Sequence, residues 1–229
     1  FVAKRFFEVG NGPRCVSIIE NATQLENEYI RLSQGQWFLD KFYERSVETD
    51  TEVSTNFMFA DALLVREVVN QDGPSPASGV SMDSFLDAMD DNPDSTIVWL
   101  LEPLRGSAIE RWSGTLKHPN HTNKPGQTMD AFMHFVYVYS QQALVLADIQ
   151  GGQKDALGEG TSGWILFDIM THTSDGGVGD HGEDGINAIL SDHICDRICR
   201  GLNIGEEHII LRKEKKGAVK GKRLSKQKQ

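Results

Sequence analysis

The chain has 229 residues, of which 39% are hydrophobic and 24% are charged, and its formal net charge at pH 7 is −10. This length allows one substantial core or two modest lobes, and the composition is typical of a globular protein. No apolar run approaches the roughly 18 residues that span a bilayer, which excludes a transmembrane helix and argues against a membrane partner.

The charge is unevenly distributed. Residues 211–229 contain nine basic residues and one acidic residue, which leaves 14 basic against 32 acidic residues in positions 1–210. We therefore predict one domain over 1–210 followed by a disordered basic tail over 211–229. The acidic body argues against a nucleic-acid partner. Three cysteines favour an intracellular, reducing location, expected to be the cytoplasm, and the tail leaves a nuclear location open.

The first half of the chain contains a long amphipathic helix. Leu25, Tyr29 and Leu32 lie at helical spacing, and Thr23 is its expected cap. Because the first strand starts without any lead-in, we expect preceding strands to belong to a longer protein. The predicted elements are a strand at 1–7, a helix at 24–48, a strand at 56–59, a loop at 72–81, a helix at 82–89 and a strand at 96–101.

The second half alternates apolar runs with polar or glycine-rich loops. The run from Ala131 to Tyr137 is rich in aromatic and β-branched residues, which predicts a buried strand. The mixed order predicts an α+β fold. The expected elements are a surface loop at 113–130, strands at 132–139, 143–149 and 164–167, a glycine loop at 176–182 and a helix from about 185.

A metal site is indicated near the C-terminal end of the domain, where His193, Cys195 and Cys199 lie within seven residues. Imidazole and thiolate are the ligands that tetrahedral zinc prefers, and a closed structural site needs four of them. His134 is the best fourth ligand, because a solvated histidine is not expected in an apolar run. A hydrogen-bonded core histidine and two small buried cysteines are the alternative.

The spacing of these residues constrains the backbone. On an ideal helix Cys195 and Cys199 share a face, whereas His193 points about 200° away from Cys195. We therefore predict that the helix starting near Gly185 breaks around His193.

Three further residues carry possible chemistry. Asp148 and Asp168 each end an apolar strand and precede a polar loop, where a carboxylate can hold a cation or accept a proton. Taken singly, such an acid is more often a turn former or a helix cap. Lys4 lies within an apolar strand, where an unpaired lysine is costly, so an anionic partner is expected.

The glycine loop Gly177-Val178-Gly179-Asp180-His181-Gly182 matches the pattern G-x-G-x-x-G. A dinucleotide-binding fold requires a following strand with a ribose-binding acid, and a helix follows here instead. We interpret Gly177, Gly179 and Gly182 either as a tight loop that brings backbone amides close to a peptide or phosphate, or as a plain turn.

Together these motifs resemble the α-kinase family, a group of atypical serine/threonine protein kinases. The resemblance runs from Lys4 to about Leu202. It is carried by Val2-Ala3-Lys4, Leu101-Glu102-Pro103, Ala131-Phe132-Met133-His134-Phe135, Asp148-Ile149-Gln150-Gly151, Leu166-Phe167-Asp168, the glycine loop and His193-Ile194-Cys195 through Cys199.

The resemblance implies a two-lobed, protein-kinase-like fold, with an N-terminal lobe over 1–101 and a C-terminal lobe over 102–210. It implies ATP-dependent phosphoryl transfer to Ser or Thr of protein substrates. It also implies a structural Zn²⁺ in the C-terminal lobe, held by His134, His193, Cys195 and Cys199, with no part in catalysis.

It further implies roles for the active-site residues. Lys4 resembles the lysine that contacts the ATP phosphates, and Asp148 takes the position of the catalytic aspartate. Glu102 falls at the hinge that meets adenine, while Gln150 and Asp168 resemble the Mg²⁺ ligands. These are the parts that phosphoryl transfer needs.

Two points remain open within this resemblance. The acid that pairs with Lys4 is expected from the first helix, as either Glu26 or Glu28. Gly151–Gly163 resembles an insertion between the two aspartates, so Asp155 or Glu159 would be the metal ligand if Asp168 is not.

The alternative function is a catalytically inactive α-kinase-like module that binds nucleotide or protein partners. The long separation of Asp148 and Asp168 and the aspartate at position 180 favour it. The joint presence of Lys4, Asp148, Gln150 and Asp168 argues for the enzyme.

Overall fold

The computed structural model describes residues 1–6, 17–104, 108–154 and 163–205. Asp155, Glu159 and the tail at 211–229 lie outside these described residues. The elements are β1 (Val2–Lys4), α1 (Ile18–Glu48), β2 (Phe57–Phe59), β3 (Leu63–Arg66), η1 (Pro76–Ser78), α2 (Met82–Asp91), β4 (Val98–Glu102), β5 (Ile109–Arg111), α3 (Lys124–Tyr139), β6 (Leu144–Ala147), β7 (Gln150–Lys154), β8 (Gly163–Phe167), β9 (Met170–Thr173), α4 (Gly182–Asp192) and α5 (Arg197–Gly201).

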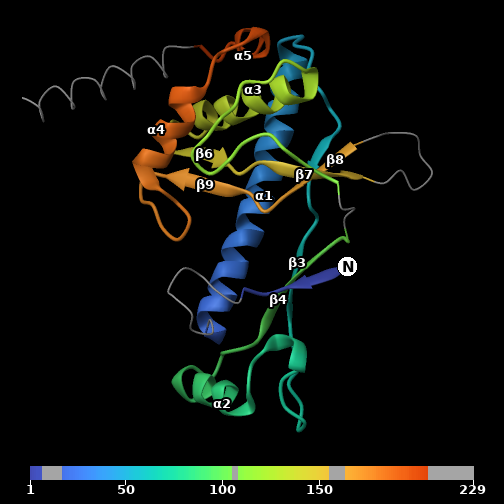
Figure 1. The fold of residues 1–229 in the computed structure, drawn as a ribbon, viewed down its shortest axis with the longest axis vertical. Coiled ribbons are helices and arrows are strands. Elements are labelled where there is room, and N and C mark those ends of the chain that lie inside the picture. The colour runs from blue at the N-terminus through green and yellow to red at the C-terminus, as the bar shows by residue number, and fades with distance from the viewer. Residues whose placement is uncertain (7–16, 105–107, 155–162, 206–229) are drawn as a thin grey trace, which may run out of the picture.

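The fold is α+β, as predicted, and α1 extends along most of its length (Figure 1). An antiparallel sheet of order β1-β4-β3 lies towards one end together with α2. The helices α3, α4 and α5 lie towards the other end, with the strands β6 to β9 between. Strand β2 pairs with β8 in a sheet of order β2-β8-β7-β5, so this sheet joins residues from both sides of the lobe boundary expected near residue 101.

Strands β6 to β9 form one long hairpin with a break in the middle. Ala147 pairs with Met170 before the break, and Gln150 pairs with Phe167 after it. The antiparallel register is the same on both sides, although the two halves belong to different sheets. Asp148 and Asp168 both lie within this break.

Helix α1 begins earlier than predicted. Ser17 accepts a hydrogen bond from the backbone of Glu20, whose side chain accepts one from the backbone of Ser17, and this capping box starts the helix at Ile18 rather than near residue 24. Thr23, the expected cap, lies inside the helix and donates to the carbonyl of Ile19. The end at Glu48 agrees with the prediction.

The predicted strand at 132–139 is wrong, because these residues form the second half of α3. The predicted loop at 113–130 is also too long, since α3 begins at Lys124, with Asn123 as its cap. The residues of α3 from Thr128 to Tyr137 are all buried, so no polar stripe reveals the helical period. Composition was then the only remaining signal, and it favoured a strand.

The predicted break near His193 is confirmed. Helix α4 ends at Asp192, His193 is extended with ψ 133°, and α5 starts at Arg197. Strand β7 was not predicted, and it occupies the start of the expected insertion. A Cβ at Gly151 would lie 3.0 Å from the Ile165 carbonyl, so close packing rather than a turn explains this glycine.

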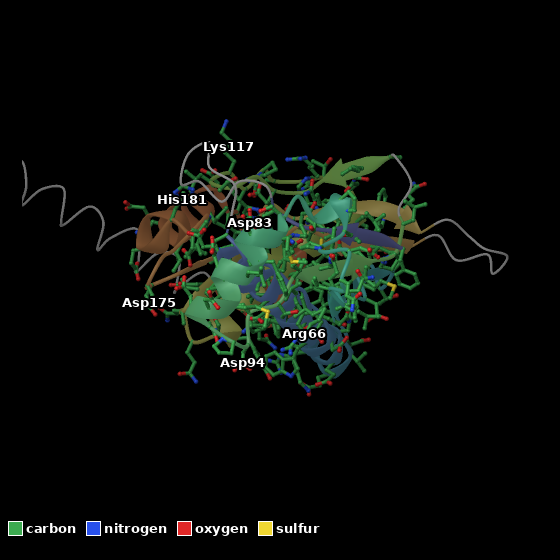
Figure 2. The ribbon with its side chains drawn as sticks, turned by 90° about the horizontal axis from the view of Figure 1, so that it is seen from below. Arg66, Asp83, Asp94, Lys117, Asp175 and His181 are labelled. Carbon is green, nitrogen blue, oxygen red and sulfur yellow. The ribbon has the colours of Figure 1, made fainter. Side chains whose placement is uncertain are left out.

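One hydrophobic core connects α1 to α3 and to the hairpin. Phe42 packs edge-on against Phe132 and Phe135. Within the described ranges, no helix has the combined length and apolar character needed to cross a membrane. Figure 2 shows charged and polar side chains at the periphery, including the exposed Arg66, Asp83, Asp94, Lys117, Asp175 and His181.

Candidate functional site

Lys4 connects three distant parts of the chain. Strand β1 directs its side chain towards α1, where the ammonium donates to Glu28 Oε1 at 2.5 Å and to the carboxylate of Asp168. The structure thus selects Glu28 over Glu26 as the helix partner. An ion pair between a sheet lysine and a helix glutamate fixes the direction of the lysine side chain.

The charges of this cluster are shaped by burial. Burial alone would lower the pKa of Lys4, but the carboxylates of Glu28 and Asp168 outweigh it and raise that pKa, so the lysine stays protonated. Burial raises the pKa of Glu28, which Lys4 only partly offsets. Two carboxyl groups, those of Glu28 and Asp168, thus contact one ammonium in this cluster.

Oxygen ligands for a hard cation converge at the same place. One carboxylate oxygen from each of Glu28, Glu102 and Asp168 lies within 4.8 Å of the others. Carboxylate oxygens are the ligands that Mg²⁺ and Ca²⁺ prefer, so this donor set fits a divalent cation. Gln150, the other expected ligand, is buried at the start of β7 beside Phe167, the neighbour of Asp168 in the chain.

A cavity of about 560 Å³ opens beside this cluster, a size typical of small-molecule sites. It combines the charged ends of Lys4 and Glu102 with apolar surface. Its lining residues are Val2, Ala3, Lys4, Arg5, Ala77, Trp99, Glu102, Pro103, Leu104, Ile109 and Phe167.

The two aspartates occupy equivalent positions in the hairpin break. Asp148 and Asp168 both have left-handed backbone, with φ of 52° and 51°, while the next residues, Ile149 and Ile169, are buried. Left-handed backbone is uncommon for residues other than glycine, but Asp and Asn adopt it most readily. The isoleucines anchor the break in the core, and each carboxylate remains partly exposed.

The carboxylate of Asp148 is held by a neighbouring segment. Thr115 Oγ1 donates to Asp148 Oδ2 at 2.7 Å, and the backbone N–H of Asp148 donates to the carbonyl of Gly114 at 3.3 Å. Ser113 Oγ accepts from the N–H of Ile149 at 2.9 Å. Thr115 was not identified from the sequence, because a threonine in a polar loop carries no pattern.

The glycine loop is organised by Asp180. Its carboxylate accepts from the N–H and hydroxyl of Thr173 and from the N–H of Gly182. Burial opposes ionisation, but these hydrogen bonds outweigh it and hold the pKa of Asp180 below its usual value. Gly177 and Gly179 have positive φ, and Gly177 lines a second cavity, of about 380 Å³, between the loop and α1.

The four expected zinc ligands do come together. His134 Nδ1 lies 3.5 Å from Cys195 Sγ, and His193 Nε2 lies 3.5 Å from Cys199 Sγ. All four are buried, with ligand atoms within 4.8 Å of one another. Zn–S bonds of 2.3 Å and Zn–N bonds of 2.0–2.1 Å at a tetrahedral angle place sulfur and nitrogen about 3.5 Å apart, so the donor set fits zinc.

The two thiols differ in acidity. The hydrogen bond from Cys199 and those from the two imidazoles lower the pKa of Cys195 well below its usual value. The same hydrogen bond and burial raise the pKa of Cys199. A thiolate already favoured at Cys195 suits a metal ligand.

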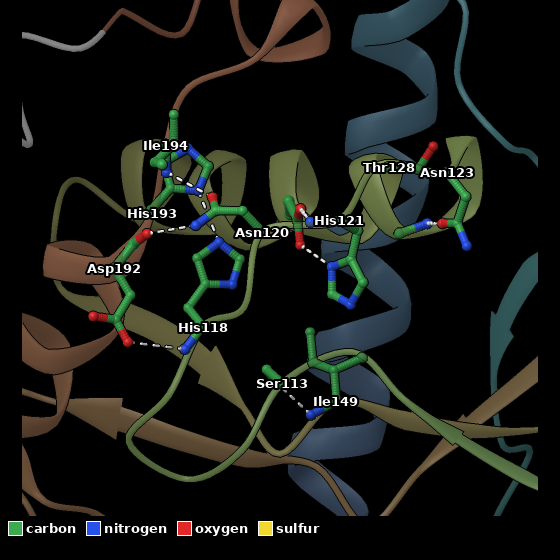
Figure 3. A network of polar contacts seen from close by, with 12 residues as sticks. Ser113, His118, Asn120, His121, Asn123, Thr128, Ile149, Asp192, His193 and Ile194 are labelled. Carbon is green, nitrogen blue, oxygen red and sulfur yellow. Dashed lines mark hydrogen bonds and ion pairs between the residues drawn. The ribbon is translucent and has the colours of Figure 1, made fainter.

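His118 supports this centre and was not identified from the sequence. Its Nε2 lies 2.8 Å from His193 Nδ1, and the two rings are stacked (Figure 3). Burial, followed by the nearby imidazoles, lowers the pKa of His118 to about 3, so the ring is neutral at physiological pH. The contact joins residues 75 positions apart, and local spacing cannot reveal it.

Comparison with known proteins gives consistent results. The family model of the Alpha-kinase family matches residues 1–199. Myosin heavy chain kinase A of Dictyostelium discoideum is 25% identical over 205 residues, which cover 82% of this chain and 16% of that protein. Myosin heavy chain kinase B of the same organism is 34% identical over 86 residues, which cover 36% of this chain and 10% of that protein.

Solved structures show the same fold. The apoenzyme α-kinase domain of myosin-II heavy chain kinase A aligns with a TM-score of 0.52 at 20% identity, covering 79% of this chain and 58% of that one. Its complex with AMP-PNP aligns with a TM-score of 0.50 at 20% identity, covering 77% and 54%. The chain thus spans somewhat more than half of these domains. Because the family model matches residues 1–199 of 229, the chain belongs to the α-kinase family.

Proposed function

We propose that this chain is a serine/threonine protein kinase domain, which transfers the γ-phosphoryl group of ATP to a protein hydroxyl. One observation carries the proposal. Lys4 is fixed between Glu28 and Asp168 at the edge of a cavity of nucleotide size, and Asp148 holds the equivalent position on the adjoining strand of the same hairpin.

In this proposal Lys4 contacts the phosphates of ATP. Glu28 orients it, and because Lys4 stays protonated it offsets the negative charge of the transferred group. The cavity takes the adenosine, with Glu102 at the end of β4 meeting the base. The kinase domains of myosin-II heavy chain kinase A, with which the fold is shared, include one in complex with AMP-PNP, which supports a nucleotide in this family.

The divalent cation would be Mg²⁺, held by Asp168 and Gln150. When bound, it would neutralise negative charge on the phosphates of ATP. The convergence of carboxyl oxygens from Glu28, Glu102 and Asp168 supports this assignment, because oxygen donors are the ligands that Mg²⁺ prefers. Asp155 and Glu159 are the alternative ligands.

Asp148 is proposed as the general base. Its Oδ2 accepts a hydrogen bond from the hydroxyl of Thr115. Its Oδ1 is then the oxygen that accepts the proton of the substrate hydroxyl. The substrate oxygen forms a bond to the γ-phosphorus as the bond from that phosphorus to the bridging oxygen of ADP breaks. Phosphoserine or phosphothreonine and ADP result, and the proton passes to Asp148.

The remaining parts support this chemistry without taking part in it. Four protein ligands leave no open position for water, so we propose that the zinc is structural. Gly177, Gly179 and Gly182 are proposed to receive the protein substrate beside the second cavity. An intracellular location, the lobes at 1–101 and 102–210 and the disordered tail at 211–229 complete the proposal.

A phosphorylation assay tests it. Wild type, Lys4→Met and Asp148→Asn are incubated with radiolabelled Mg-ATP and a basic Ser/Thr peptide. Lys41→Met is the matched control, because Lys41 is a half-buried lysine that also pairs with a glutamate, Glu44, but lies outside the proposed site. Removing one active-site group should reduce turnover about 10²–10⁴-fold, whereas the control should retain it. Wild type that binds Mg-ATP without transferring phosphate would establish the inactive binding module instead.

A further inference from the structure

Residues 113–120 form an irregular segment between β5 and α3. Figure 3 shows contacts at its two ends, from Ser113 to Ile149 and from His118 to His193. One end contacts the backbone and carboxylate of Asp148, and the other end contacts His193. These two residues are 45 positions apart in the sequence. We call residues 113–120 the strap.

The first end of the strap is bound tightly to the hairpin break. The N–H of Ser113 donates to the carbonyl of Ile149 at 3.2 Å, and Ser113 Oγ accepts from the N–H of the same residue. Gly114 and Thr115 hold the backbone and the carboxylate of Asp148, as described above. A shift of this end would therefore move the proposed general base.

The middle of the strap is also fixed. The fully buried His172 donates its Nε2–H to the carbonyl of Thr115 at 2.6 Å, and the N–H of Gly114 donates to the carbonyl of Lys117 at 2.9 Å. These hydrogen bonds restrict the backbone between the two ends of the strap. We therefore expect a displacement of one end to move the other end as well.

The second end is bound to the ligand loop. Asn120 Nδ2 donates to the carbonyl of Asp192 at 2.9 Å, and Asn120 Oδ1 accepts from the N–H of Ile194 at 3.0 Å. These bonds hold the backbone on both sides of His193. His118 then contacts the His193 ring itself, at 2.8 Å between Nε2 and Nδ1.

The donor and the acceptor of the hydrogen bond between His118 and His193 can be assigned. A His193 that binds metal through Nε2 must carry its proton on Nδ1, and His118 Nε2 is placed to accept it. Within the described residues, His118 Nδ1 is buried without a hydrogen-bond partner. A half-satisfied buried imidazole costs stability compared with an apolar side chain, so orienting His193 explains its presence better than packing does.

We propose that the strap is the element through which the metal centre positions the carboxylate of Asp148, with His118 and Thr115 as positioning residues at its two ends. This inference rests on the proposed function and on the proposed zinc site. It adds that the position of Asp148 depends on the metal centre. The zinc and its ligands take no part in the reaction itself.

The test compares His118→Leu, His118→Gln and Thr115→Val, with Lys117→Ala as an exposed control on the same strap. Each variant of the whole 229-residue chain is loaded with zinc, and its metal content is measured before use. Three experiments follow. They measure the rate of zinc transfer to a chelator, then kcat and KM for ATP, and then amide hydrogen exchange at Asp148 and Ile149 relative to Leu166 in β8.

We expect His118→Leu to release zinc about 10–100-fold faster, with His118→Gln closer to wild type because its amide oxygen also accepts a proton. Both His118→Leu and Thr115→Val should lower kcat with little change in KM. His118→Leu should accelerate exchange at Asp148 and Ile149 but not at Leu166. The Lys117→Ala control should match wild type in every measurement.

Two outcomes overturn the proposal. If His118→Leu releases zinc faster but leaves kcat and the exchange at Asp148 unchanged, the two centres are not coupled. If it changes neither zinc release nor exchange, His118 does not orient His193. The exchange and release measurements need no turnover, so an inactive wild type would refute the proposed function while the coupling is still decided.

Discussion

Gly185 in α4 should not tolerate a methyl group, although alanine is normally the better helix residue. A Cβ at this position would lie 2.4 Å from Cγ and 2.5 Å from Cδ2 of His172. The ring cannot move aside easily, because it is fully buried, donates to Thr115 and accepts from the N–H of His181 at 3.2 Å.

The expected size of the effect follows from three contributions. Replacing glycine by alanine inside a helix stabilises by about 1 kcal/mol. Overpacking of a rigid core costs about 1–3 kcal/mol, and losing one hydrogen bond of His172 costs about 1 kcal/mol more. Gly185→Ala should therefore lower the free energy of unfolding by about 1–3 kcal/mol, which corresponds to a fall in Tm of roughly 2–12 °C.

Thermal and guanidinium unfolding of the whole chain measure this change. Gly114→Ala is the matched control, because its Cβ would meet only Lys117 Cβ at 3.9 Å and its backbone is not left-handed. The control should be neutral or stabilising by less than about 1 kcal/mol. If Gly185→Ala melts at or above the temperature of Gly114→Ala, the His172 ring is not fixed as described.

Three further results are expected. Because the folded pKa of Asp180 is lowered, its ionised form stabilises the fold at pH values above the unfolded pKa near 4. Wild type should therefore melt above Asp180→Asn at pH 7, and this difference should shrink as the pH falls below about 4. A difference in melting temperature that stays constant down to about pH 3 would contradict this. Asn123→Ala, which removes the cap of α3, should cost about 1 kcal/mol in denaturant titrations, and an unchanged midpoint would exclude the cap. Elemental analysis should find about one zinc per chain, and a chelator should lower the melting temperature of wild type but not of a metal-free Cys199→Ser variant.

The elements with a one-sided pattern were predictable from the sequence. The body of α1 has a buried face and an exposed face, so its period is visible, and the break at His193 followed from side-chain geometry alone. Helix α3 could not be recognised in this way, because burial on all sides removes the polar residues that mark a helical period. Strand β7 was hidden by Gly151 and Gly152, since glycines are typical of turns; at Gly151 a Cβ would instead crowd the carbonyl of Ile165 and the side chain of Trp112.

The site shows a similar division. Lys4, Asp148 and the metal residues could be selected because each is costly or unusual where it stands, and the motif order linked them to a family. Thr115, His118 and His172 could not, because their importance lies in contacts made across the fold. Position in space, rather than residue type, makes them part of the site.

The shared register of the hairpin has a consequence for how such a domain can vary. Cross-strand pairs on both sides of the break determine where Asp148 and Asp168 lie. The number of residues that join Lys154 to Gly163 does not affect these pairs. Doubling the length of such a connection costs only about 0.6 kcal/mol in closure entropy. The length of the connection between Lys154 and Gly163 can therefore change at small entropic cost, while the paired strands keep the mutual geometry of Asp148 and Asp168.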